Sequence, residues 1–257
     1  MKNIKTSVII PTSKNEKIEN INRTIKSVIL GAFDEIEVLV LADGWIPEGI
    51  YKKAKVSSSS LNLGERKTVN RGFKESSGDY VLRIDAHCSM SRFWDRFLLK
   101  QYEDDTVSLC VLDALDEETW EPKNRSFAFV YVDNDCKEKW WTNYKQSFCR
   151  CEPSMSLTGC GWFCNRQFFL DNLQFDEDLS KWGAIGPEIT AKIERAGSSI
   201  ILNKNVRCNH VFNTAKPGYP VKEVDRTREQ LLERYSQFLY KAAKRFNAPG
   251  WGFSETK

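Results

Sequence analysis

The stretch Tyr80-Val81-Leu82-Arg83-Ile84-Asp85-Ala86-His87-Cys88 decides the fold that this sequence predicts. Its apolar first half predicts a buried strand, and Asp85 and His87 follow at the strand's end. Side chains two positions apart on an extended backbone point the same way, so this carboxylate and imidazole are placed to bind one metal ion. The chain's other histidine, His210, follows a second strand-like stretch and is the expected third ligand. The alternative is that both histidines are ordinary hydrogen-bonded residues of the core or surface.

Strands and helices alternate from this stretch back to the N-terminus. Strands are predicted at 4–10 and 37–42, and amphipathic helices at 18–29 and 64–76. Such alternation is typical of an α/β protein with a mostly parallel sheet, in which ligands bind at the carboxyl ends of the strands. Pro11, which we expect to end the first strand, Asp43 and Asp85 all fall at such ends. We therefore expect these residues to border one crevice, although Asp43-Gly44 is also an ordinary turn pair.

The second half of the sequence is less regular. Strands are predicted at 107–112, 127–132 and 199–209, and helices at 186–196 and 221–246, the last of which is amphipathic. Gly159 and Gly161 lie in Thr158-Gly159-Cys160-Gly161-Trp162-Phe163, where small residues allow a backbone to approach a ligand.

The composition is that of a folded globular protein. Of 257 residues, 41% are hydrophobic and 28% are charged, so disorder is excluded. The net charge of +3 is too small for the basic face of a dedicated nucleic-acid binder. Because the sequence contains neither a signal-peptide pattern nor a membrane-spanning apolar stretch, we expect a cytoplasmic protein.

The chain has eight cysteines, which we expect to be free thiols in such a compartment. Four of them lie close together in the sequence: Cys149, Cys151, Cys160 and Cys164. Their spacing differs from the standard zinc motifs, so buried thiols are favoured over a zinc site there.

The order of these motifs resembles that of a nucleotide-sugar glycosyltransferase with the GT-A fold. The resemblance is carried by the strand that ends at Pro11-Thr12, by Asp43-Gly44, by Asn62-Leu63-Gly64 with Arg66, Asn70 and Arg71, and by the Asp85-Ala86-His87 triplet. An Asp-X-His triplet is similar to that of the polypeptide N-acetylgalactosaminyltransferases, whereas many relatives have Asp-X-Asp. The glycine-rich segment at 158–163, Trp182-Gly183 before Glu188, and His210 continue the resemblance over roughly residues 4–212.

The resemblance implies a GT-A (Rossmann-like), mostly parallel sheet flanked by helices, in one domain over residues 1–257. About 1–115 would bind the nucleotide sugar, about 116–215 the acceptor, and 221–246 would form the C-terminal helix. The implied donor site has three parts, which are the nucleoside pocket of Pro11, Thr12 and Asp43, the diphosphate contacts of Arg66, Asn70 and Arg71, and the metal ligands Asp85, His87 and His210. Trp182 would also contact the donor, and Gly159, Cys160, Gly161 and Trp162 would contact the donor or acceptor sugar. Mixed oxygen and imidazole ligands favour Mn²⁺, with Mg²⁺ as the alternative.

Glu188 stands where the family has an acidic residue that faces the acceptor. In an inverting enzyme it would accept the acceptor's proton, and in a retaining enzyme it would position a sugar while the leaving phosphate accepts that proton. The Asp-X-His form favours retention. The chain departs from the family's Gly-Gly-Glu because four residues separate Trp182-Gly183 from Glu188. Glu177 and Asp178 are lesser candidates, although such charged residues are also typical of a solvated loop.

We therefore expect a metal-dependent transferase that moves a sugar from a UDP-sugar to an acceptor hydroxyl. We expect neither a membrane anchor nor a lectin domain, which disfavours a polypeptide acceptor and leaves a glycan, a lipid-linked glycan or hydroxymethylated DNA. Basic residues of the last helix would serve DNA, although acidic residues between them favour a solvated face. A non-catalytic nucleotide- or glycan-binding module of the same fold is the other alternative. The donor sugar, the acceptor, the stereochemical outcome and the oligomeric state stay open at this point.

Overall fold

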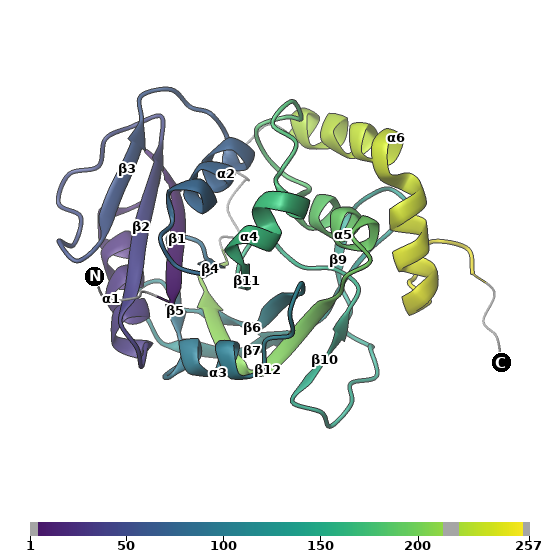
Figure 1. Ribbon diagram of the computed structural model, residues 1–257, viewed down its shortest axis with the longest axis horizontal. Helices are drawn as coiled ribbons and strands as arrows, with labels where there is room; N and C mark the ends of the chain where they lie inside the picture. The colour runs from purple at the N-terminus through teal and green to yellow at the C-terminus, as the bar shows by residue number, and fades with distance from the viewer. Residues whose placement is uncertain (1–4, 213–220, 254–257) are drawn as a thin grey trace.

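The computed structural model describes residues 5–212 and 221–253. Its strands are β1 (Thr6–Ser13), β2 (Ile36–Asp43), β3 (Lys55–Ser59), β4 (Tyr80–Arg83), β5 (Cys88–Met90), β6 (Val107–Leu115), β7 (Pro122–Phe127), β8 (Val130–Val132), β9 (Glu138–Trp140), β10 (Cys151–Ser154), β11 (Trp162–Asn165) and β12 (Ile200–His210). Its helices are α1 (Ile18–Gly31), α2 (Glu65–Glu75), α3 (Trp94–Lys100), α4 (Arg166–Phe168) with the π-helical turn Phe169–Leu173, α5 (Ile185–Arg195) and α6 (Val221–Phe246). Figure 1 shows the arrangement, with α1 and the first strands at one end and α6 at the other.

One large sheet runs through the molecule in the order β10-β12-β6-β11-β4-β1-β2-β3. The half formed by β4, β1, β2 and β3 is parallel, as the alternation of strands and helices predicts. In the other half β11 is antiparallel to both of its neighbours, and β5, β7 and β10 also pair antiparallel. The predicted α/β architecture with flanking helices is confirmed, but the sheet is mostly parallel only in its N-terminal half.

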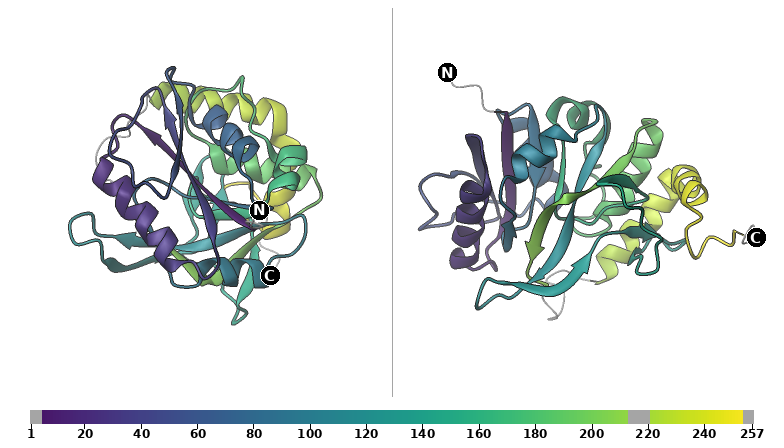
Figure 2. Two further views of the ribbon diagram at one scale, coloured as in Figure 1. Left: turned by 60° about the vertical axis from the view of Figure 1, so that its left-hand side comes forward. Right: turned by 90° about the horizontal axis from the view of Figure 1, so that it is seen from below.

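Helices cover both faces of the parallel half because alternate strand residues point to opposite faces. Val8 and Ile10 of β1 pack in the core under α1, whereas Ile9 between them packs in the core under α2. All three side chains are fully buried. The two views of Figure 2 show α1 on the outer side of these strands and α6 at the far end of the molecule.

Two strand boundaries differ from the sequence prediction. The first strand does not stop at Pro11 but continues to Ser13, because Pro11 pairs with Leu41 of β2 while the pairing with β4 has already ended at Ile9. Proline lacks a backbone N–H, so it is tolerated where one side of the strand forms no backbone hydrogen bonds with a neighbouring strand. The predicted strand at 127–132 is broken, since β7 pairs with β6 and β8 pairs with β9 in a separate sheet.

The predicted C-terminal helix is present as α6. Its apolar stripe, with Leu231, Tyr235 and Leu239, packs in a third core together with Ala191 of α5. Within residues 5–212 and 221–253, no helix combines the length and the apolar character needed to cross a membrane.

Candidate active site at the carboxyl ends of the parallel strands

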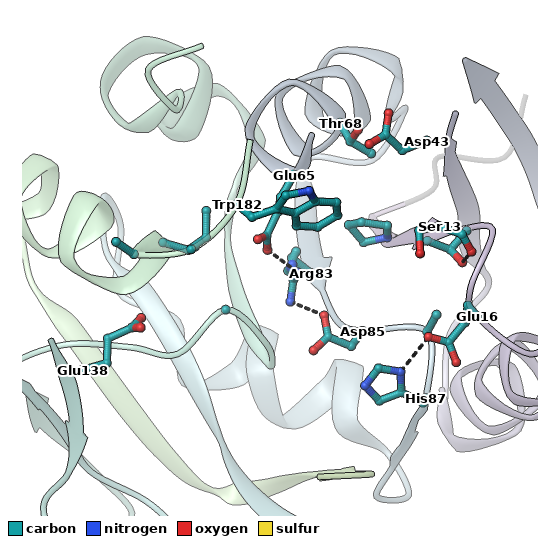
Figure 3. A pocket seen from close by; sticks show the side chains of 17 residues that line it. Ser13, Glu16, Asp43, Glu65, Thr68, Arg83, Asp85, His87, Glu138 and Trp182 are labelled. Carbon is teal, nitrogen blue, oxygen red and sulfur yellow. Dashed lines mark hydrogen bonds and ion pairs between the residues drawn. The ribbon is translucent and has the colours of Figure 1, made fainter. Parts of the chain in front are cut away.

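A pocket of about 360 Å³ opens at the carboxyl ends of β1, β2 and β4. It is lined by Pro11, Thr12, Ser13, Glu16, Asp43, Glu65, Thr68, Arg83, Asp85, Ala86, His87, Glu138, Gly159, Trp182, Gly183, Ala184 and Ile185. Figure 3 shows Asp85, His87 and Glu16 on one side of it and Glu138 on the other. The crevice expected between Pro11, Asp43 and Asp85 is therefore present.

The two histidines meet beside Asp85. Strand β5 follows His87 immediately and pairs antiparallel with the end of β12, with Cys88 opposite His210. This pairing brings Nε2 of His87 to 3.2 Å from Nε2 of His210, which lies 3.0 Å from Oδ2 of Asp85. Neighbouring ligands of one ion, each about 2.1 Å from it, lie about 3 Å apart, so each of these two contacts has the spacing of a shared cation. The ligand atoms that all lie within 4.8 Å of one another belong to Asp85, Cys160 and His210, so His87 adjoins this group through His210.

Glu16 orients the imidazole of His87. Its Oε2 lies 3.0 Å from Nδ1 of His87. With Nδ1–H donating to this carboxylate, Nε2, which faces His210, is the nitrogen that can bind an ion once it loses its proton. Burial lowers the pKa of His87, but the hydrogen bond to Glu16 and the charge of Asp85 outweigh burial and raise the pKa to about 9. Among the described residues, Nδ1 of His210 has no hydrogen-bond partner, so Nε2 carries the polar contacts of that ring.

Arg83 holds the carboxylate of Asp85 from the opposite side. Its NH1 lies 2.7 Å from Oδ1 of Asp85, and its NH2 donates to Oε1 of Glu65 at 2.7 Å. Burial disfavours the charged form of Asp85, yet Arg83 and His210 hold the pKa of Asp85 well below its usual range. Asp85 is thus kept ionised, and Figure 3 shows Arg83 between it and Glu65.

The predicted nucleoside-binding residues line the other end of the pocket. Pro11, Thr12 and Asp43 are among its walls, together with Thr68 of α2. Oδ1 of Asp43 accepts from the N–H of Leu63 at 2.6 Å, and Oδ2 accepts from the N–H of Gly64 at 2.9 Å. Asp43 therefore orders the turn before α2, and the remaining lone pairs of its carboxylate stay available to a ligand.

Arg66 and Glu188 lie away from the pocket, contrary to their predicted roles at the diphosphate and the acceptor. Nε of Arg66 donates to Oε2 of Glu188 at 2.7 Å, and both side chains are buried. NH1 and NH2 of Arg66 donate to the carbonyls of Ser180 and Gly183 at 2.9 Å. The prediction that Glu188 accepts the acceptor's proton or positions a sugar does not fit this geometry, because its carboxylate has no solvent-exposed surface and is neutralised by Arg66 and Lys192.

Asn70 and Arg71 also bind protein groups. The amide of Asn70 bonds to both backbone groups of Phe175, at 2.9 and 3.0 Å. Arg71 donates to the carbonyls of Ala42 and Ser57 at 3.3 and 3.4 Å. These contacts hold α2 against neighbouring segments, so neither residue is placed to contact a diphosphate in the pocket.

The glycine-rich segment contributes one residue to the pocket. Gly159 lines it, whereas Cys160 and Trp162 are buried. Nε1 of Trp162 donates to the carbonyl of Gly159 at 3.2 Å and thereby positions it. Gly161 has φ +77°, and a Cβ there would lie 2.9 Å from Cδ2 of Leu112, so only glycine fits. The predicted sugar contacts of Cys160, Gly161 and Trp162 do not fit these positions.

Sequence reasoning missed several pocket residues. Glu16, Glu65, Arg83 and Glu138 all line the pocket, as do Ser13 and Thr68. Glu16 follows the end of β1 closely and Arg83 precedes Asp85 by two positions, so both carried a positional signal. Glu138 lies in the irregular second half, where no pattern in the sequence places a residue near the strand ends.

The cysteines clustered in the sequence do not gather in space. All eight cysteines are free. Cys149 is exposed, while Cys160 and Cys164 belong to different hydrophobic cores. Of the four, only Cys160 and Cys164 are the buried thiols that the sequence predicts, since Cys149 is exposed and Cys151 is partly buried.

Comparisons with known proteins agree with the fold. The N-acetylgalactosaminyltransferase 7 of Drosophila melanogaster is 28% identical in an alignment of 243 positions that covers 83% of this chain and 40% of that relative. The crystal structure of GalNAc-T7 with UDP, GalNAc and Mn²⁺ superposes with a TM-score of 0.76 at 18% identity, covering 97% of this chain and 55% of that one. Staphylococcus aureus TarS 1–349 superposes with a TM-score of 0.55 at 16% identity, covering 96% and 67%.

The chain thus spans less than half the length of the fruit-fly relative. The family model described as glycosyl transferase family 2 matches residues 7–172. This match includes the first strands, the Asp85-Ala86-His87 triplet and the glycine-rich segment. Since it covers more than half of the 257 residues, the chain belongs to glycosyl transferase family 2, and its structure has the GT-A fold.

Proposed function

We propose that the protein is a metal-dependent glycosyltransferase that moves a sugar from a UDP-sugar to an acceptor hydroxyl with retention of configuration. The observation that carries this proposal is the contact of His210 with both Asp85 and His87, two residues that line the strand-end pocket. UDP-GalNAc is the first donor to test, because the structural relative was solved with UDP, GalNAc and Mn²⁺.

The excess of negative charge in the pocket supports the proposal that a diphosphate binds there together with a cation. Five of the described residues that line it carry a carboxylate, namely Glu16, Asp43, Glu65, Asp85 and Glu138, whereas only Arg83 and the imidazole of His87 can carry positive charge. A diphosphate entering this surface alone would be repelled. A divalent ion held by Asp85, His87 and His210, Mn²⁺ for preference given the imidazole ligands, would neutralise the negative charge that develops on the leaving diphosphate.

The chain's own residues prepare this site. Arg83 keeps Asp85 ionised and fixes its orientation, and Glu16 fixes the ring of His87. Asp43 orders the turn that leads into α2 and borders the nucleoside end of the pocket. Arg66 fixes the loop around Trp182, whose ring forms a wall of the pocket. These preformed contacts reduce the reorganisation that donor binding requires.

The position of Glu188 supports retention. An inverting enzyme needs a base that faces the acceptor hydroxyl, and Glu188 is buried in an ion pair. In a retaining reaction the leaving phosphate accepts the acceptor's proton, so the protein has to orient the acceptor without supplying a base. The acceptor that we propose is a glycan or lipid-linked glycan, which would enter over Gly159 and the wall formed by Gly183, Ala184 and Ile185.

The proposal is tested first by thermal unfolding with UDP, GDP, CDP or TDP, each with Mn²⁺ or with EDTA. A ligand at about a hundred times its dissociation constant adds about 2.7 kcal/mol of stability. We expect stabilisation by UDP that requires Mn²⁺, and its loss in Asp85→Ala and His87→Ala but not in the exposed control Asp135→Asn.

Release of UDP from UDP-GalNAc then measures turnover, and the anomeric configuration of the product reports retention. Mn²⁺-dependent UDP binding without turnover of any UDP-sugar, with acceptor glycans present, would favour a non-catalytic binding module. Unchanged turnover in both ligand variants would overturn the metal assignment.

A further inference from the structure

Three cysteines that are far apart in the sequence meet inside the sheet. Cys88 begins β5, Cys160 precedes β11, and Cys208 lies in β12. The Sγ atoms of Cys88 and Cys160 are 3.5 Å apart, and those of Cys160 and Cys208 are 3.9 Å apart. All three sulfur atoms lie within 4.8 Å of one another, and all three residues are buried. We call this group the thiol triad.

The spacing of the thiol triad matches that of ligands on one thiophilic ion. Zinc binds thiolate sulfur at about 2.3 Å, so two sulfur ligands of a tetrahedral zinc ion lie about 3.8 Å apart. The distances of 3.5 and 3.9 Å in the thiol triad lie on either side of this value. Apolar side chains that only fill a hydrophobic core do not require their terminal atoms to lie so close to one another.

The surroundings of the triad also suit a thiolate site. The backbone N–H of Asp85 donates to Sγ of Cys160 at 3.4 Å, which is the kind of contact that stabilises negative charge on a metal-bound sulfur. Gly161 lies beside the triad, since a Cβ there would be 3.5 Å from Cβ of Cys208. The absence of a side chain at Gly161 thus allows the segment that carries Cys160 to pass close to β12.

We propose that Cys88, Cys160 and Cys208 form a second metal site that binds a thiophilic d¹⁰ cation of the zinc class. Binding replaces up to three S–H bonds by sulfur–metal bonds, and the protons leave to solvent. The ion would connect β5, the segment before β11 and β12 directly behind the strand-end pocket. Because Cys160 also lies within 4.8 Å of ligand atoms of Asp85 and His210, the two sites share a wall.

The thiol triad is distinct from the Asp85, His87 and His210 site. The proposal that it binds a metal ion does not depend on whether the protein transfers sugars. The two sites differ in ligand softness, since thiolates select zinc-class ions whereas mixed oxygen and imidazole ligands accept Mn²⁺. The expected physical effect is stabilisation of the fold, because an ion that binds the folded state alone raises the free energy of unfolding.

The experiment uses the full chain, reduced and freed of metal, and titrates it with Cd²⁺. Cadmium–thiolate bonds give an ultraviolet charge-transfer band that imidazole and carboxylate ligands do not give. We expect one equivalent of Cd²⁺ to produce the band in the unmodified protein and in His87→Ala/His210→Ala, in which the neighbouring site is removed. We expect Cys88→Ser/Cys208→Ser to lose the band and Cys164→Ser, a buried cysteine of a different core, to keep it.

A second measurement avoids dependence on variants that fold poorly. In the unmutated protein, one equivalent of Zn²⁺ should protect Cys88, Cys160 and Cys208 from alkylation, as read by peptide mass spectrometry, while exposed Cys149 reacts at an unchanged rate. The proposal is overturned if no thiolate band forms at one equivalent, if the band survives in Cys88→Ser/Cys208→Ser, or if Zn²⁺ leaves the alkylation rates of the triad unchanged.

Discussion

Nε of Arg66 and Oε2 of Glu188 lie 2.7 Å apart, although 122 residues separate them in the sequence. Neither side chain is accessible enough to be hydrated, and Lys192 approaches the other oxygen of Glu188 at 2.9 Å. The pair joins α2 to α5, and the remaining guanidinium donors hold the carbonyls of Ser180 and Gly183. Glu188 therefore supports the loop that carries Trp182, and its effect on catalysis is indirect.

Glu188→Ala should lower the free energy of unfolding by about 3–5 kcal/mol, because it leaves Arg66 buried without a carboxylate partner and Lys192 with Asp176 alone. Urea denaturation measures this loss. The control is Arg71→Ala, which removes only two long hydrogen bonds and should cost much less. A Glu188→Ala protein that unfolds like the unmutated chain but has lost turnover would restore Glu188 as a catalytic residue.

Glu16→Gln should weaken Mn²⁺ binding by about 10–100-fold, the usual effect of changing a group that orients a metal-bound histidine. The amide oxygen of glutamine still accepts from Nδ1–H of His87 but brings no negative charge. Titration of Mn²⁺ by electron paramagnetic resonance gives the affinity. Glu19→Gln is the matched control, since Glu19 is exposed on α1 and paired with Arg23. Equal affinities for the two variants would contradict the role of Glu16.

Much of the fold was predictable because the parallel half of the sheet follows local rules. A strand that is buried on both faces, as at Val8, Ile9 and Ile10, is visible as a short apolar run, and the intervening helices have clear apolar stripes. The antiparallel half depends on pairings between distant segments, such as β11 between β4 and β6. Those pairings are set by the tertiary structure, so short strands such as β5 and β9 carried no readable signal.

The residues of the candidate site were also predictable only in part. Residues at strand ends, such as Asp43, Asp85 and His87, were placed correctly because strand ends share one edge of the sheet. Residues on helices were not, because a helix presents several faces and the sequence does not say which one meets the pocket. Arg66 faces α5, whereas Glu65, its neighbour in the sequence, faces the pocket.

Gly64→Ala should destabilise the protein and abolish stabilisation by UDP and Mn²⁺. Gly64 has φ +88°, and an added Cβ would lie 2.6 Å from Cβ of Lys181 and 2.7 Å from its Cα. The substitution would therefore push away the segment that leads to Trp182. Gly197→Ala is the control, because Gly197 has φ +70° but no atom within 4 Å of the added Cβ. It should cost only about 1–2 kcal/mol of backbone strain and retain UDP binding. Equal effects of the two substitutions in thermal unfolding with UDP would show that the contact with Lys181 does not matter.

Glu138 should make the folded state less stable as the pH rises toward neutrality. Burial raises the pKa of Glu138 from its ordinary value of 4.5 to about 7, although its Oε1 accepts from the N–H of Gly186 at 2.9 Å. Between about pH 4.5 and pH 7 the folded state keeps a proton that the unfolded chain releases, so stability falls across this window and is level on either side. Glu138→Gln keeps the acceptor for Gly186 but removes the titration. The free energy of unfolding of Glu138→Gln should therefore increase relative to that of the unmutated protein as the pH rises through this window. Glu121→Gln, a substitution on the surface, should show no such increase. Urea denaturation at a series of pH values tests this, and a constant difference between Glu138→Gln and the unmutated protein would show that Glu138 titrates as it does in the unfolded chain.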